Sequence, residues 1–310
     1  MNVSHQEERR GERLLDVLTD ETLGLRIIVS RLGAELISIA RRDANGAWRG
    51  FLHRDNDLTP PASGWANHAT VMGYFLHRLK EGVSLYRGHE IRGNTHSFLR
   101  AKVWTLVAKP DEPHALTYRM TPGDFSPTDY PLNVSLDLTY RLTGDTVTTE
   151  FSFANDEPQL SAHVGFGLHP GFAAQGADSF EFHLPPGTYR RHFSPENYLV
   201  AETEDIRFGG GEMPFPKDKL KGSYILELLD VPDRNFTYID RASGRSIALD
   251  FSEVPYVTLW SDGGAFLCVE PCWGLTDHHE QRAFEDKAGI QRIAPRGELH
   301  AKCAMRPTLL

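Results

Sequence analysis

The stretch VSLDLTYRLTGDTVTTEFSF, residues 134–153, decides the fold class of this chain. Bulky, mostly apolar side chains occupy every second position from Val134 to Tyr140 and again from Val147 to Phe153, on either side of a turn at Gly144. Because successive side chains of a strand point to opposite faces, this period of two predicts an antiparallel hairpin with one buried face.

Similar strand signals extend outward from this hairpin in both directions. They occur at residues 25–29, 36–39, 103–107, 116–120, 247–251, 256–260 and 265–269. Helical periodicity is scarce, and 19 prolines and 27 glycines punctuate many short segments. Long runs of strands with few helices are typical of a sandwich or barrel. We therefore expect an all-β protein, a large antiparallel β-sandwich forming one domain over residues 1–310, with the polar residues 1–13 as a flexible terminus.

Composition excludes some partners. The net charge of -9 argues against nucleic acid or an anionic membrane surface. The three cysteines, Cys268, Cys272 and Cys303, suit a reduced compartment better than a disulfide framework. We see no apolar leader at the N-terminus and no uninterrupted apolar run of about 18 residues, the length of a membrane span. These observations predict a cytoplasmic protein that does not enter a membrane.

One histidine lies in an unusual setting, GFGLHPGF at residues 165–172. Histidine is the side chain most easily poised to give or take a proton near neutral pH. Pro170 biases His169 to an extended backbone, and the surrounding glycines permit close approach of a ligand or another strand. A core histidine that hydrogen-bonds a backbone carbonyl is the alternative that the residues leave open.

One carboxylate interrupts an apolar strand, FLCVEP at residues 266–271. A buried carboxylate is costly unless it is paired or hydrogen-bonded, and such groups often have functionally tuned proton affinity. We expect Pro271 to end the strand and to leave Glu270 at a rim of the sheet. The alternative is a structural salt bridge between Glu270 and an arginine.

Other motifs point to no cofactor. The sequence DHHE at residues 277–280 resembles a metal cluster, but adjacent histidines on an extended chain point to opposite faces. We find no dinucleotide or phosphate-binding glycine loop, and no nucleophile elbow. The residues therefore predict neither a metal nor an organic cofactor. His96 and Arg78 could hydrogen-bond a ligand, but a loop histidine and a surface arginine are the ordinary alternatives.

The chain resembles the aldose 1-epimerase (galactose mutarotase-like) family over residues 25–307. The motifs that carry the resemblance are GFGLHP, residues 165–170, and LCVEP, residues 267–271, in this order and on an all-β background. The resemblance implies a galactose mutarotase-like sandwich that binds a small sugar and interconverts its anomers without a metal or cofactor. We therefore expect His169 and Glu270 to face each other across a sugar-sized cleft.

The resemblance also implies a role for each matching residue. Glu270 matches the general base that takes the proton of the anomeric hydroxyl, and His169 matches the general acid that protonates the ring oxygen. His96 matches a histidine near the ring oxygen, and Arg78 matches a sugar-contacting arginine. Asp233 matches, more loosely, an aspartate that grips sugar hydroxyls.

The sequence departs from the family pattern in two places. Ser97 stands where the family usually has glycine, and Gly171 stands where many members have an aromatic residue. We expect both changes to line the pocket and to bear on the identity of the sugar. The alternatives are a non-catalytic sugar-binding or sugar-sensing protein on the same scaffold and a polysaccharide lyase or hydrolase. The absence of an evident second acid weakens the hydrolase.

Overall fold

The computed structural model describes residues 3–176, 179–214, 217–280 and 282–310, and it is built almost entirely from antiparallel strands. The hairpin predicted at residues 134–153 forms β11 (Val134–Thr143) and β12 (Thr146–Asn155), paired in unbroken register. It lies near one end of a nine-stranded sheet. In spatial order this sheet contains β17 (Gly211–Glu212), β14 (Phe180–Leu184), β19 (Asn235–Asp240), β20 (Arg245–Asp250), β24 (Glu298–Leu309), β12, β11, β10 (Ala115–Met120) and β9 (Thr105–Val107).

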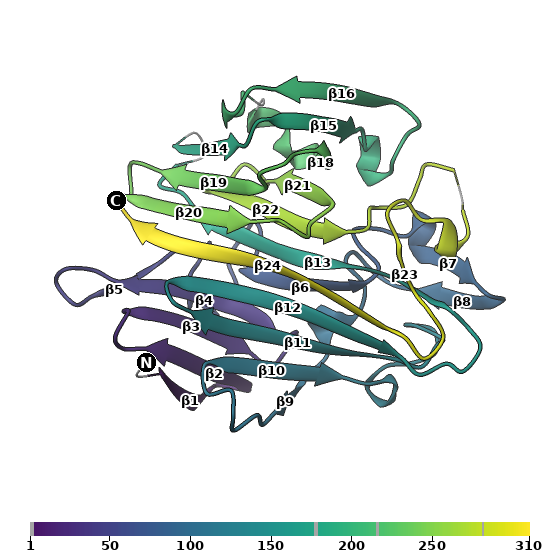
Figure 1. Ribbon diagram of the computed structural model, residues 1–310, viewed down its shortest axis with the longest axis horizontal. Helices are drawn as coiled ribbons and strands as arrows, with labels where there is room; N and C mark the ends of the chain where they lie inside the picture. The colour runs from purple at the N-terminus through teal and green to yellow at the C-terminus, as the bar shows by residue number, and fades with distance from the viewer. Residues whose placement is uncertain (1–2, 177–178, 215–216, 281) are drawn as a thin grey trace.

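An eight-stranded and a five-stranded sheet form the opposite layer. The eight-stranded sheet contains β16 (Thr203–Phe208), β15 (Gly187–His192), β18 (Tyr224–Asp230), β21 (Tyr256–Trp260), β22 (Phe266–Trp273), β13 (Ala162–Ala173) and β23 (Gln291–Ile293), with β6 (Ala69–Tyr74) also pairing with β13. The five-stranded sheet contains β1 (Val3–Arg10), β2 (Arg13–Asp20), β3 (Leu25–Ser30), β4 (Glu35–Arg42) and β5 (Trp48–Gly50). Figure 1 shows the nine-stranded sheet across the front, with β13 and β6 behind it.

The remaining elements are short. Strands β7 (Val83–Tyr86) and β8 (His89–Arg92) form a separate hairpin. The helices of the described residues are 3-10 segments: η1 (Lys80–Gly82), η2 (Leu99–Ala101), η3 (Pro122–Asp124), η4 (Pro195–Asn197), η5 (Lys217–Gly222) and η6 (Phe284–Asp286). In these ranges, no helix is both long and apolar enough to cross a bilayer.

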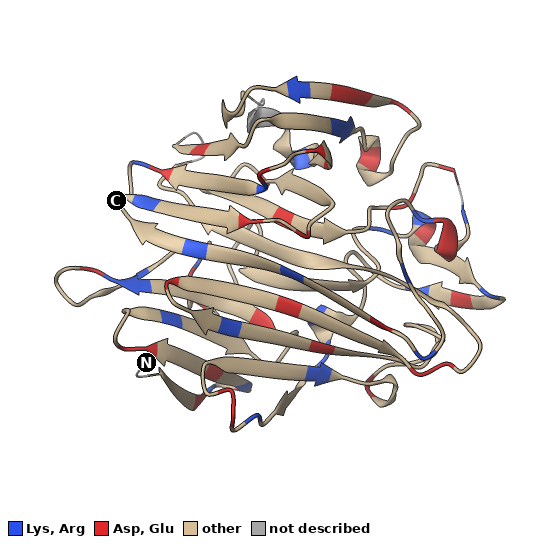
Figure 2. Cartoon of the chain, in the orientation of Figure 1, with Lys and Arg blue, Asp and Glu red and all other residues tan. Residues whose placement is uncertain are grey.

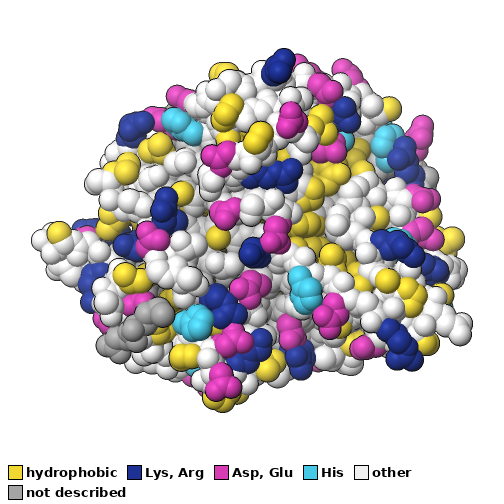
Figure 3. Space-filling view, in the orientation of Figure 1, with side chains coloured by type: hydrophobic (Ala, Val, Ile, Leu, Met, Phe, Trp, Pro, Cys, Tyr) yellow, Lys and Arg dark blue, Asp and Glu magenta, His cyan; other side chains and the backbone are white. Residues whose placement is uncertain are grey.

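Aromatic side chains fill the space between the layers. Phe151 and Phe153 of β12 project inward and meet Phe166 of β13, with ring centroids 5.0 and 4.8 Å apart. On the outer face of the same sheet, Arg119 and Asp137 form an ion pair at 2.6 Å. Charges of both signs are interspersed along these strands and over this face (Figures 2 and 3). The predicted alternation of buried and solvated side chains, and with it the large antiparallel sandwich, is confirmed.

The expectation of a flexible N-terminus is wrong for Val3–Arg10, which form strand β1. This strand pairs with β2 along its whole length, and His5 contacts the buried Asp16 at 2.9 Å. Its polar sequence hid the strand because β1 lies at an edge, where most of its side chains are solvated and need no apolar alternation.

Candidate active site

The histidine and glutamate singled out in the sequence meet on two neighbouring strands. Strands β13 and β22 pair with Gly167 opposite Cys272 and Gly171 opposite Cys268. The same register sets His169 opposite Glu270. Neither Pro170 nor Pro271 has an amide hydrogen to donate, and the regular pairing of the two strands is interrupted between the flanking pairs. His169 Nε2 lies 3.2 Å from Glu270 Oε1.

This arrangement corrects two expectations. Strand β22 continues through Pro271 to Trp273, so Glu270 lies inside the sheet and not at its rim. Pro271 is compatible with the strand because it lies where the pairing with β13 is interrupted, while it still pairs with Val257 on the other side. The two side chains are also in direct contact, so they do not face each other across a cleft. Among the described residues, His169 and not an arginine pairs with the Glu270 carboxyl.

The pair lines a pocket of about 290 Å³. The pocket is lined by Trp65, Asn67, Thr70, His77, Arg78, Thr95, His96, Arg100, His169, Ser194, Asn197, Ser223, Ile225, Trp260, Glu270 and Thr276. Four buried polar atoms in it have no hydrogen-bond partner among the described residues: Thr70 Oγ1, His96 Nδ1, His169 Nδ1 and Glu270 Oε2. Buried polar atoms are rarely left unpaired, so their convergence points to a polar ligand.

Burial governs the protonation of the pair. Loss of hydration raises the pKa of the Glu270 carboxyl well above its ordinary value. Burial, with a smaller contribution from His77, lowers the pKa of His169 to about 3. Both shifts favour the uncharged forms, so the proton that the two groups can share is favoured on the carboxyl of Glu270, beside a neutral His169 imidazole.

A cluster of histidines extends the site. The His96 ring lies 5.1 Å from that of His169 and 5.3 Å from that of His77. Burial, followed by His169, lowers the pKa of His96 well below its ordinary value, so it lies neutral beside the pair. His96 thus joins the pocket as the sequence predicted. His77 was not singled out in the sequence, where its only signal is its position next to Arg78.

The departure at Ser97 has a backbone explanation. His96 and Ser97 both have a φ of 64°, the left-handed region that favours glycine. A glycine at position 97 would adopt this conformation without the steric cost that serine carries. Ser97 is not among the residues that line the pocket, which corrects the expectation that it does.

Two arginines bring positive charge to the pocket. Arg78 is exposed at its rim and Arg100 is half-buried in its wall. Neither guanidinium forms an ion pair or a side-chain hydrogen bond with the described residues, so both are available to a ligand. Arg78 was predicted as a site residue. Arg100 stands four residues after His96 and follows Leu99, whose backbone begins η2.

Asp233 does not belong to this site, and that prediction is wrong. Its exposed carboxylate accepts hydrogen bonds from the Asn235 amide nitrogen at 3.1 Å and from the Asn235 side chain at 2.5 Å, in the turn before β19. This is the ordinary use of an aspartate at the start of a turn. Asp233 does not line the pocket.

Two tryptophans from other segments, Trp65 and Trp260, bring aromatic side chains to the pocket near Gly171, which has none. Trp65, from the loop between β5 and β6, lies against His169 with the two rings tilted and their centroids 5.0 Å apart, and Trp260 meets the same His169 ring at 5.7 Å. A Cβ atom at position 171 would lie 2.4 Å from the Trp65 ring. Gly171 therefore shapes the pocket indirectly, by making room for Trp65. No strand pattern or motif marks Trp65 in the sequence, because it lies in an irregular proline-rich loop.

Replacing Gly171 with alanine is expected to lower the free energy of unfolding by about 1–3 kcal/mol, the usual cost of overpacking a tight interior. The added methyl group would displace the Trp65 ring, which other contacts hold: its amide nitrogen donates to Asp262 Oδ2 at 2.8 Å. Urea unfolding provides the measurement. Gly209→Ala is the control because nothing lies within 4 Å of its added Cβ. Equal stability of the two variants would contradict the tight fit of Trp65.

Asp277, the first residue of the DHHE motif, has a structural role. Asp277 is buried, and its carboxylate contacts the Lys287 ammonium and accepts a hydrogen bond from the Lys80 amide at 2.6 Å. The Asp277 amide donates to the carbonyl of Arg78 at 3.1 Å. Asp277 thus anchors the segment that carries His77 and Arg78 into the pocket.

Comparisons with known proteins agree with this architecture. A family model described as "Aldose 1-epimerase" matches residues 16–185, more than half of the chain. The plasmid protein LacX of Lactococcus lactis subsp. lactis is 25% identical over 247 residues, covering 74% of this chain and 82% of LacX. The structure is similar to that of a galactose mutarotase related enzyme from Lactobacillus acidophilus, with a TM-score of 0.81 and 22% identity, covering 94% of this chain and 97% of that one. A galactose mutarotase-like protein from Lactobacillus casei gives a TM-score of 0.78 and 20% identity, covering 98% and 100% of the two chains.

Proposed function

Because the chain belongs to the aldose 1-epimerase family, we propose that it interconverts the α and β anomers of a hexose or a related aldose. One observation carries the proposal: the 3.2 Å contact between His169 and Glu270 in the lining of the pocket. The two oxygens that must exchange protons, the anomeric hydroxyl and the ring oxygen, are bonded to the same carbon. An acid and a base that serve both must therefore lie close together, as these two side chains do.

The reaction begins with opening of the sugar ring. Glu270, as carboxylate, takes the proton of the anomeric hydroxyl, while His169, as imidazolium, protonates the ring oxygen. The bond from the anomeric carbon to the ring oxygen breaks, and an aldehyde forms. After rotation about the bond between the first two carbons, the freed hydroxyl attacks the other face of the aldehyde. On closure, Glu270 returns its proton to the anomeric oxygen and His169 recovers a proton from the attacking hydroxyl.

Both protonation states of the pair take part in this cycle. In the free protein the shared proton is favoured on Glu270, because burial raises the pKa of that carboxyl and lowers the pKa of His169 to about 3. This is the state in which the pair meets the open-chain aldehyde. Transfer of the proton across the 3.2 Å contact converts it into the carboxylate–imidazolium state that opens the ring. Each positioned proton transfer typically contributes about 10²–10⁴-fold to the rate.

The rest of the pocket is suited to hold the sugar. His96 lies beside His169 and would contact the region of the ring oxygen. Arg78 and Arg100 offer donors to outer hydroxyls, since neither guanidinium is paired with a described residue. The rings of Trp65 and Trp260 offer aromatic surface beside the pair. The sugar is a small-molecule substrate in this account, and no metal or cofactor takes part in the reaction.

The alternative functions find less support. A non-catalytic sugar-binding protein would not require the acid and base to be aligned, yet the two side chains are in contact. Hydrolysis with two carboxylates requires carboxyl groups about 5–10 Å apart in one site. Glu270 is the only carboxylate among the described residues that line the pocket.

Polarimetry of freshly dissolved α-anomers tests the proposal. We expect the protein to accelerate the change in optical rotation for at least one sugar in a panel of common aldoses and their phosphates. Heat-inactivated protein is the control, because spontaneous mutarotation must be subtracted. If the protein accelerates the change in optical rotation for no sugar of the panel, the epimerase function is contradicted and the result favours a non-catalytic sugar-binding protein.

A further inference from the structure

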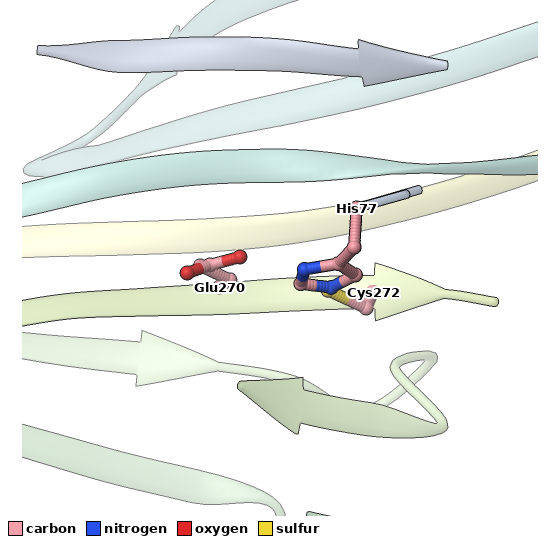
Figure 4. Close-up of side chains that lie close together, drawn as sticks. All are labelled: His77, Glu270 and Cys272. Carbon is pink, nitrogen blue, oxygen red and sulfur yellow. The ribbon is translucent and has the colours of Figure 1, made fainter. Parts of the chain in front are cut away.

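Three side chains of different chemistry converge beside the pocket, and two of them, His77 and Glu270, line it. Glu270 and Cys272 are two residues apart on β22, so they point to the same face of the strand. His77 follows β6 and lies over Cys272 (Figure 4), with its Nε2 atom 4.0 Å from the Cys272 sulfur. One oxygen of Glu270, the His77 nitrogen and the Cys272 sulfur all lie within 4.8 Å of one another. We refer to these residues as the His77–Glu270–Cys272 cluster.

The donor set suits one class of ion. Thiolate sulfur, imidazole nitrogen and carboxylate oxygen are the ligands of Zn²⁺ and related transition metals, whereas Mg²⁺ and Ca²⁺ prefer oxygen alone. Zinc bonds to these atoms place tetrahedral donors roughly 3.4–3.6 Å apart. The observed separations therefore require side-chain movements on the order of 1 Å. Three protein ligands with one open position is an arrangement that zinc commonly adopts.

Three further observations favour a bound ion. Glu270 is 1% exposed and its Oε2 atom has no hydrogen-bond partner among the described residues, so it retains an unused donor. His77 and Glu270 both line the pocket, which gives an ion a route from solvent. The Cys272 thiol has only weak contacts, 3.9 Å to Thr258 Oγ1 and 4.0 Å to His77. Loss of these contacts on metal binding would cost little.

We propose that the His77–Glu270–Cys272 cluster binds a thiophilic divalent metal ion, Zn²⁺ in the first instance, and that the bound ion switches off the His169–Glu270 pair. Two protons are released as the ion binds: the thiol proton of Cys272 as the sulfur–metal bond forms, and the carboxyl proton of Glu270 as its oxygen becomes a ligand. A Glu270 carboxylate that ligates the ion cannot accept a proton from a sugar. The binding site stands on its geometry alone, and only the inhibition rests on the proposed function.

Titration with Co²⁺ tests the binding directly, because a cobalt–thiolate bond gives an intense near-ultraviolet charge-transfer band. We expect the metal-free, reduced protein to develop this band with one equivalent of Co²⁺ and to lose it when Zn²⁺ is added. Cys272→Ser should abolish the band, and His77→Gln should weaken Co²⁺ binding at least tenfold. Cys268→Ser and Cys303→Ser, which each remove another buried thiol, should retain it. A band that persists in Cys272→Ser, or no band in the native protein, would overturn the site.

Inhibition is measured on the same variants. Zn²⁺ should stop the anomer interconversion of the native protein, and a chelator should restore it. The inhibiting Zn²⁺ concentration should be at least tenfold higher for Cys272→Ser than for Cys303→Ser, each compared with its own metal-free rate. Equal sensitivity would overturn the inhibitory role. If the metal-free protein has no activity on any sugar, the proposed function fails while the cobalt titration still decides the site.

Discussion

Replacing Glu270 with glutamine is expected to lower kcat for anomer interconversion by about 10²–10⁴-fold, the usual worth of one positioned proton transfer. Glutamine has nearly the shape of the carboxyl group, but its amide cannot accept the proton of the anomeric hydroxyl. The fold should tolerate the change, because burial already raises the pKa of Glu270 and favours an uncharged group at this position. Polarimetry gives the rate, and urea unfolding gives the stability.

Glu212→Gln is the matched control for this substitution. It makes the same chemical change at an exposed position in β17, outside the pocket. We expect its kcat and stability to equal those of the native protein. A Glu270→Gln variant that is folded and as active as Glu212→Gln would remove Glu270 from the role of base.

Replacing His169 with glutamine is expected to cause a loss of kcat of similar size, about 10²–10⁴-fold. A glutamine amide can donate a hydrogen bond to the ring oxygen but cannot transfer a proton to it. The variant keeps the pocket near its native volume, so the Michaelis constant should change less than kcat. Initial rates over a range of sugar concentrations separate the two effects. A fall in affinity with kcat unchanged would make His169 a binding residue and not the acid.

The pH dependence of the free energy of unfolding provides a second test of His169→Gln. Burial lowers the pKa of His169 in the folded protein to about 3, whereas histidine in an unfolded chain has a pKa of about 6.5. As the pH falls below that value, the unfolded state binds a proton that the folded state does not, so the native protein loses stability. Between pH 7 and pH 5, His169→Gln should gain about 2 kcal/mol relative to the native protein. If the free energies of unfolding of the two proteins changed equally between pH 7 and pH 5, His169 would not be held neutral in the folded protein.

Much of the fold followed from local sequence. Alternating side chains marked the β11–β12 hairpin because one of its faces is buried and the other solvated. Strand β1 gave no such pattern, since most of its side chains are exposed at a sheet edge. Pro271 suggested a strand end because proline removes a hydrogen-bond donor, but only the pairing of β22 with both neighbours shows that the strand continues. The organisation of the chain as a single domain stays a prediction.

The residues alone marked the part of the site that lies on strands, whereas the loop residues His96 and Arg78 were assigned to it only through the family resemblance. His169 and Glu270 stand out because glycines, prolines and apolar neighbours surround a titratable group. Trp65 lies in a loop that no periodicity describes, and its place in the site depends on tertiary packing against Gly171 and His169. The prediction for Asp233 was wrong because the sequence around it is explained equally well by a turn, in which its carboxylate accepts a hydrogen bond from the Asn235 amide.

The central claim is that His169 and Glu270 together open and close a sugar ring, and one measurement tests it most directly. Magnetisation exchange between the two anomers at equilibrium reports the interconversion rate in matched samples of the native protein, Glu270→Gln and His169→Gln. The sugar is one that the native protein accelerates in polarimetry. We expect the native protein to raise the exchange rate far above that of the sugar alone, and both variants to return it nearly to the uncatalysed value. Folded variants that exchange the anomers as fast as the native protein would contradict the account.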